Sequence, residues 1–104
     1  MFAYILNGDL EKFKDLWLRI KDVYEKKNVN PVTFQIFEPV FNYLNGKDAK
    51  IGEFENKLMV ENMVFLVGIM HLSYYIVSKN EVSKSKADDI FKRLALKNYE
   101  KYLR

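Results

Sequence analysis

The sequence predicts an all-α fold in one domain over residues 1–104. Apolar residues recur at three- and four-residue spacing in four segments, and capping or turn residues separate these segments. One segment, residues 62–78, carries no charge at all and is apolar on every side. Such a helix has to be surrounded by other structure. We therefore expect a small four-helix bundle around an apolar central helix, more than about 65% helical.

The first of these segments runs from Asp9 to about Lys27. Asp9 is a suitable N-cap, and the preceding residues, Phe2 to Leu6, form a short lead-in that ends at Asn7-Gly8. The apolar positions of the segment keep to one side of a helix, as expected for a surface helix that packs on a core. They are Leu10, Phe13, Leu16, Trp17, Ile20, Val23 and Tyr24.

The second segment begins at Pro31, after Asn30 as N-cap, and ends at Asn45-Gly46. Pro39 lies inside it, where proline removes a backbone hydrogen bond and crowds the preceding turn. We expect a kink there, or two short helices that meet at Glu38, which would raise the number of helices to five. The alternation over residues 32–36 leaves a short strand as the alternative.

The third helix is expected from Asp48 to about Val77, with a break near Gly52 as an alternative. Glu61 and Asn62 fall on its apolar side if the helix is continuous. A buried carboxylate needs a partner, so this pair is expected either to be buried with one or to mark a break. His71, the only histidine, is expected to be partly buried and hydrogen-bonded.

The last helix is expected to start between Ser83 and Ser85 and to run nearly to Arg104. On a continuous helix five basic residues would form a ridge within about 80° of arc, and a phosphate backbone could lie along it. Ile90 falls inside the ridge and Glu100 beside it, which favours a solvated face instead. The ridge consists of Lys86, Arg93, Lys97, Lys101 and Arg104.

Composition excludes several classes of function. The chain has no cysteine and one histidine, so zinc sites of His and Cys and any Cys–His pair are excluded within it. We expect no cofactor and no metal. The absence of cysteine fits an intracellular protein, and cytoplasm is the expected location. The apolar run is too short and too interrupted for a membrane span.

These features predict a non-enzymatic interaction module that self-associates, most simply as a dimer, or docks on a protein partner through apolar helix surface. Leu18 falls on the charged side of the first helix, and unbranched methionines suit surfaces that accept partners. The predicted interface residues are Leu18, Met59, Met63 and Met70. The alternative is a nucleic-acid-associated domain that uses the basic ridge. The last 26 residues carry a net charge of +4, whereas residues 1–78 carry −1, so the basic excess belongs to the C-terminal segment.

Overall fold

The computed structural model describes residues 1–103. Helices make up 73% of the chain and the described residues contain no strand, which confirms the predicted all-α class and helical content. The helices are more numerous and shorter than expected. They are α1 (Phe2–Leu6), α2 (Leu10–Lys26), α3 (Val32–Gln35), α4 (Glu38–Leu44), α5 (Ile51–Val60), α6 (Val64–Ser78), α7 (Glu81–Arg93) and the 3₁₀ helix η1 (Glu100–Leu103).

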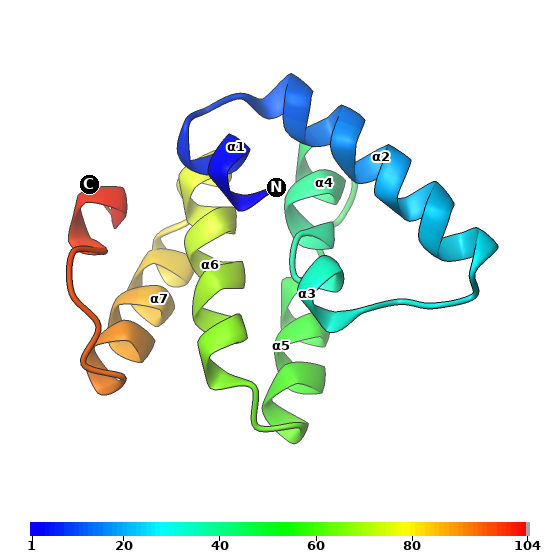
Figure 1. Ribbon diagram of the computed structural model, residues 1–104. Coiled ribbons are helices and arrows are strands. Elements are labelled where there is room, and N and C mark those ends of the chain that lie inside the picture. Colours follow the sequence, from blue (N-terminus) through cyan, green and yellow to red (C-terminus); the bar gives the residue numbers. More distant parts are fainter. Residues whose placement is uncertain (104) are drawn as a thin grey trace.

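Helix α6 stands at the centre of the molecule, with α7 on one side and α4 and α5 on the other (Figure 1). Helix α2 lies across one end, and its C-terminal half extends past the other helices before the chain returns through an extended segment to α3 (Figure 1). The buried hydrophobic side chains form one cluster from Ile5 to Leu103. The most extensive helix–helix contact is between α6 and α7, which are consecutive in the chain.

The first two segments behave as the sequence predicts. Helix α2 covers the range expected from Asp9, and it ends where Asn28 adopts the left-handed conformation (φ 55°). Pro39 lies in the first turn of α4, where its missing N–H costs nothing. The second segment is therefore divided into α3 and α4 at Glu38, as expected, and the alternative strand over residues 32–36 is wrong.

The expected continuous helix from Asp48 to Val77 is wrong, because the chain breaks after Val60. Asn62 adopts the left-handed conformation (φ 58°), which asparagine tolerates better than most residues. The amides of Asn62 and Met63 donate to the carbonyls of Met59 and Leu58, which closes the end of α5. Glu61 and Asn62 are exposed in this turn. Because of the break, the polar pair lies in solvent instead of on the apolar face of a continuous helix.

Helix α6 is tightly covered on the side that faces α7. Gly68 lies so close to α7 that a Cβ atom there would stand 2.7 Å from a ring carbon of Phe91. Leu72 and Tyr75, one and two turns along the same side, are also buried. Other positions of α6 are only half-buried and Phe65 is exposed, so the expectation of a helix surrounded on every side is met only in part.

The expected helix to Arg104 is also wrong, because α7 ends at Arg93. Ala95 adopts the left-handed conformation (φ 55°), and the amide of Leu96 donates to the carbonyl of Phe91. The chain then folds back and buries Tyr99 and Leu103 (Figure 1). The hydroxyl of Tyr99 lies 3.0 Å from a carboxylate oxygen of Asp88 on α7. The apolar residues of the last segment therefore contribute to the core through a turn instead of through a longer helix.

Candidate functional site

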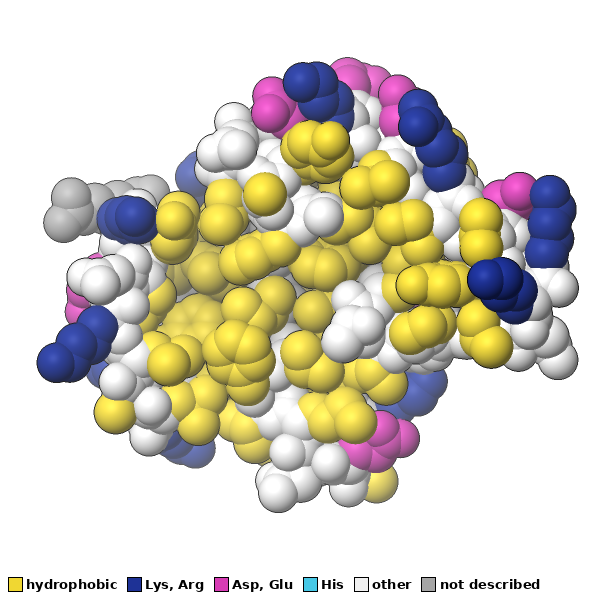
Figure 2. Space-filling view, viewed as in Figure 1, with side chains coloured by type: hydrophobic (Ala, Val, Ile, Leu, Met, Phe, Trp, Pro, Cys, Tyr) yellow, Lys and Arg dark blue, Asp and Glu magenta, His cyan; other side chains and the backbone are white. Residues whose placement is uncertain are grey.

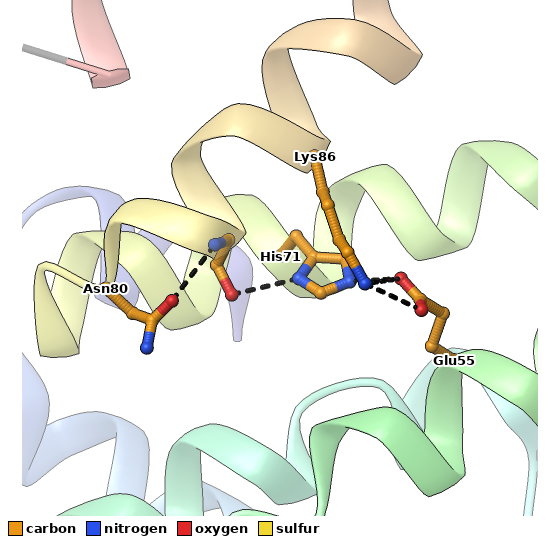
Figure 3. A network of polar contacts seen from close by, with 5 residues as sticks. Glu55, His71, Asn80 and Lys86 are labelled. Carbon is orange, nitrogen blue, oxygen red and sulfur yellow. Dashed lines mark hydrogen bonds and ion pairs between the residues drawn. The ribbon is translucent and has the colours of Figure 1, made fainter.

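A partly buried polar network links the three helices of the C-terminal half (Figure 3). The imidazole of His71 on α6 lies 2.6 Å from Glu55 Oε1 on α5 through Nε2, and 2.9 Å from Ser83 Oγ on α7 through Nδ1. The ammonium of Lys86, one turn further along α7, donates to both oxygens of Glu55 at 2.9 and 3.2 Å. This arrangement confirms the expectation that His71 is buried and hydrogen-bonded.

The charges of the network follow from its surroundings. Burial lowers the pKa of His71, although the bond to Glu55 acts against this, so the imidazole is neutral at neutral pH. Burial also raises the pKa of Glu55, but hydrogen bonds from Lys86 and His71 outweigh it and the net pKa lies below its usual range. A neutral ring that donates from Nε2 to the carboxylate accepts from Ser83 at Nδ1. Every polar atom of His71 is thus satisfied.

Local sequence places Ser83 in this network. Asn80 caps α7, and its side-chain oxygen accepts from the backbone amide of Ser83 at 3.0 Å. This fixes the first turn of α7 and holds the hydroxyl of Ser83 within hydrogen-bond distance of His71. Each of the two side chains is only 2% exposed. The Ser–His–Glu order matches the connectivity of an acyl-transfer triad, but a nucleophile buried to this degree has no room for a substrate. The geometry favours a structural link.

The basic residues do not form the ridge that a continuous helix would give. Lys86 and Arg93 lie on α7, Lys97 lies in the turn after it, and Lys101 lies on η1. Arg104 lies outside the described residues. The left-handed residues Ala95 and Asn98 redirect the chain between these positions. The structure therefore separates residues that the sequence analysis placed on one face.

Some of these basic residues already have partners within the molecule. Lys86 is bound to Glu55 in the network described above. The guanidinium of Arg93 lies 2.9 Å from Asp89, one turn earlier on α7. The ammonium of Lys101 lies 5.0 Å from the ring centroid of Tyr102. These contacts compete with binding of a phosphate backbone at the same groups.

The predicted interface residues divide into surface and core. Leu18 on α2 and Met59 near the end of α5 are 51% and 50% exposed. Met63 is half-buried at the start of α6. Met70 is fully buried in α6 and is part of the core. The methionines do not form one line, because the break at Asn62 rotates α5 relative to α6.

A second candidate site is an apolar surface over α6. Figure 2 shows hydrophobic side chains gathered over α1, α3, α4 and α6, with a hollow beside α6. Four large apolar side chains of α6 fall within about 100° of arc at 100° per residue. Phe65 is 49% exposed, and the others are half-buried against the core. We name them the α6 stripe: Phe65, Leu66, Ile69 and Ile76.

The sequence analysis missed both Glu55 and the part played by Lys86 in the network. Glu55 lies in α5 without any distinctive spacing to His71, and only the turn at Asn62 brings α5 back beside α6. The sequence did contain one local signal for this network: Asn80 lies three residues before Ser83, and asparagine at that position indicates the start of a helix. The remaining contacts depend on tertiary structure.

Comparison with known proteins does not identify the chain. No protein-family model matches the sequence, and no curated protein and no solved structure is significantly similar to it. Within the described residues no helix is long and apolar enough to cross a membrane. The same part of the chain contains no group of three or more His, Asp or Glu side chains arranged to hold a metal ion.

Proposed function

We propose that the protein is a non-enzymatic interaction module. It docks through the α6 stripe either on a second copy of the chain or on a different protein. The observation that carries the proposal is that the most apolar helix has one exposed and three only partly buried large side chains along one side. Scattered exposed apolar residues are normal on a monomer, but a contiguous apolar patch typically marks an interaction site.

The apolar surface extends beyond α6 at the turn from α5. Val60, the last residue of α5, is 87% exposed, and Met59 before it is 50% exposed. Phe65 follows in the first turn of α6. Aromatic and methionine side chains are enriched at the centres of protein interfaces, while charged residues are depleted there. The composition of this surface therefore supports a protein partner.

Binding of nucleic acid is less well supported. Phosphate contact needs basic groups that are free to move to the backbone and are spaced along it. Two of the five basic residues hold carboxylates on the same molecule, and the chain turns between Arg93 and Lys101. A stretch of positive charge remains, but the single helical face that favoured this alternative is absent.

A charge placed in the stripe tests the proposal. We expect Ile69→Lys to remove docking, since a lysine at the centre of an apolar interface has to be desolvated. Sedimentation velocity at low and high micromolar concentration measures self-association directly. If the native chain stays monomeric, chemical cross-linking in extracts, compared between native chain and variant, reports a partner that is lost with the charge.

Val82→Lys is the matched control, because Val82 is 63% exposed on α7 and does not belong to the stripe. Thermal unfolding of both variants checks that each still folds. The proposal is wrong if Ile69→Lys and Val82→Lys behave alike in both measurements, or if the native chain neither self-associates nor cross-links to any protein.

A further inference from the structure

A cavity of about 410 Å³ lies between the C-terminal half of α2, the connection that follows it and α3. Its volume falls in the range of small-molecule sites. Its walls combine aromatic rings with carboxylates, and the residues that matter here are Trp17, Lys21, Tyr24, Glu25, Phe34 and Glu38. None of these belongs to the α6 stripe, so the cavity is a separate feature from the docking surface proposed above.

Three aromatic rings form a corner in this cavity. Trp17 stacks on Phe34 with centroids 5.0 Å apart and planes 18° apart. Tyr24 meets Phe34 edge-on, at 5.3 Å and 84°. Trp17 is 2% exposed and Phe34 is 7% exposed, so these two rings are fixed by the core. Two ring planes at a right angle can contact one ligand from two sides.

The polar part of the wall is fixed as well. The amide nitrogen of Gln35 donates to the carbonyl of Asn30 at 2.5 Å, and the ammonium of Lys57 on α5 donates to the amide oxygen of Gln35 at 2.8 Å. These bonds hold the connection after α2 against α3 and join α3 to α5. The cavity is therefore largely preformed, which lowers the entropic cost of binding.

An ammonium group already occupies the aromatic corner. Lys21 Nζ lies 5.2 Å from the ring centroid of Trp17 and 3.8 Å from a carboxylate oxygen of Glu25. The side chains of Lys21 and Glu25 are 45% and 66% exposed, so this contact is open to solvent and can be displaced. Among the described residues Glu38 has no ion pair at all. The cavity wall itself thus carries two carboxylates and one amine.

We propose that this cavity binds a small organic cation, in which an ammonium or quaternary ammonium group is attached to an apolar body. The cation replaces Lys21 over Trp17, where the negative ring face and a nearby carboxylate both attract positive charge. The exchange replaces one ammonium with another beside Glu25, and the displaced Lys21 side chain, which is already 45% exposed, moves into solvent. The apolar body packs in the corner formed by Tyr24 and Phe34, and Glu38 supplies the second carboxylate.

The experiment uses benzyltrimethylammonium as the probe and the emission of Trp17 as the signal. Trp17 is the only tryptophan of the chain, so a change in its fluorescence reports on the cavity. We expect a saturable change with the cation, and none with neutral benzyl alcohol or anionic benzenesulfonate at the same concentrations. Equal responses to all three compounds, or no response to the cation at millimolar concentration, would overturn the proposal.

Variants of the wall locate the site. Tyr24→Leu should weaken binding about fivefold, because the aromatic contact with the apolar body of the ligand is lost, while Tyr24→Phe should retain it. Glu38→Gln should weaken binding, whereas Asp22→Asn on the exposed face of α2 should not. Lys21→Gln should strengthen it, because the internal competitor is removed. Circular dichroism confirms that each variant folds, and unchanged affinity in folded Tyr24→Leu and Glu38→Gln proteins would show that the cation binds elsewhere.

Discussion

The α6–α7 pair and the α2 arm (residues 10–31) both pack on the core, yet they are held by different means. The backbone of α6 at Gly68 packs against the side chain of Phe91 on α7, and the two helices share the His71–Ser83 bond. Helix α2 buries only Phe13 and Trp17 fully, and most of its length is solvated. The number of buried residues, more than the regularity of the pattern, therefore determines how firmly a helix is attached.

Trp17 is the larger of the two fully buried side chains that anchor the arm. Trp17 stacks against Phe34 at 5.0 Å and against Phe41 at 4.1 Å, which ties α2 to α3 and α4. The comparison predicts that the arm opens before the α6–α7 pair does.

The largest expected effect comes from removing that anchor. Trp17→Ala should lower the free energy of unfolding by about 3–5 kcal/mol, because a large buried ring leaves a cavity. Native-state amide exchange should accelerate mainly in α2 and α3 and much less in α6. Leu18→Ala, at an exposed neighbour, is the control with little effect. Equal acceleration in α6 and α2 would mean that the two regions unfold as one unit.

The next largest effect is expected where α6 and α7 approach each other most closely, at Gly68. Gly68→Ala puts a methyl group 2.7 Å from the ring of Phe91, which is itself 2% exposed and has little room to move. Overpacking of this kind costs about 1–3 kcal/mol, more than the helix propensity gained. Gly52→Ala is the matched control, since nothing lies within 4 Å of its Cβ position. Urea denaturation should show a loss for the first variant and a small gain for the second.

Acid should weaken the pair through the network. The pKa of His71 is lowered by burial from the ordinary value of 6.5, so below that pH the unfolded chain takes up a proton that the folded chain does not. Stability therefore falls as the pH drops below 6.5. Burial raises the pKa of Glu55, but its bonds to Lys86 and His71 hold it below the ordinary 4.5, so its contribution is lost at still lower pH.

Chemical denaturation of the native chain and of His71→Gln, from neutral pH to about pH 5, separates these two groups. The variant should be less stable at neutral pH and should lose the first part of the pH dependence. A native chain whose stability is flat over this range would show that His71 titrates alike in the folded and unfolded states.

The smallest effect concerns a buried hydroxyl on α6. Ser73 is fully buried and its Oγ atom has no hydrogen-bond partner among the described residues. Ser73→Ala should raise the free energy of unfolding by up to about 1 kcal/mol, because an unsatisfied polar group is removed without loss of volume. Thermal unfolding measures the change. A loss of stability would mean that the hydroxyl is bonded in solution.

Periodicity and proline chemistry were sufficient for the first half of the fold. The amphipathic pattern after Asp9 predicted α2 almost to its last residue, and Pro39 predicted the division of the second segment. Both signals are local, because a helix face and a proline ring act on neighbouring turns.

The errors arose where non-glycine residues adopt the left-handed conformation. Asn62 and Ala95 have φ values of 58° and 55°, and each ends a helix that the hydrophobic pattern would continue. Alanine gives no local indication of such a turn. In both places the gain comes from tertiary packing: α5 returns beside α6, and Leu103 reaches the core.

The candidate sites depend on these same turns, so they were not visible in the sequence. Glu55 reaches His71 only because the chain reverses at Asn62, and the basic ridge is dispersed because it reverses at Ala95. Trp17 and Tyr24 were assigned correctly to the apolar face of the first helix, whereas Phe34 was not placed on a helix face. The near-perpendicular orientation of the Tyr24 and Phe34 rings depends on the path of residues 27–31, which local sequence does not indicate.

The connection between α6 and α7 also bears on how fast the protein folds. Only Lys79 and Asn80 separate the two helices that share the largest interface, so little chain entropy is lost when they close on each other. Proteins dominated by contacts between sequence neighbours fold in microseconds to milliseconds. We expect the α6–α7 hairpin to form the folding nucleus. The α2 arm is expected to dock in a later step that affects neither the folding rate nor the folding pathway of the other helices.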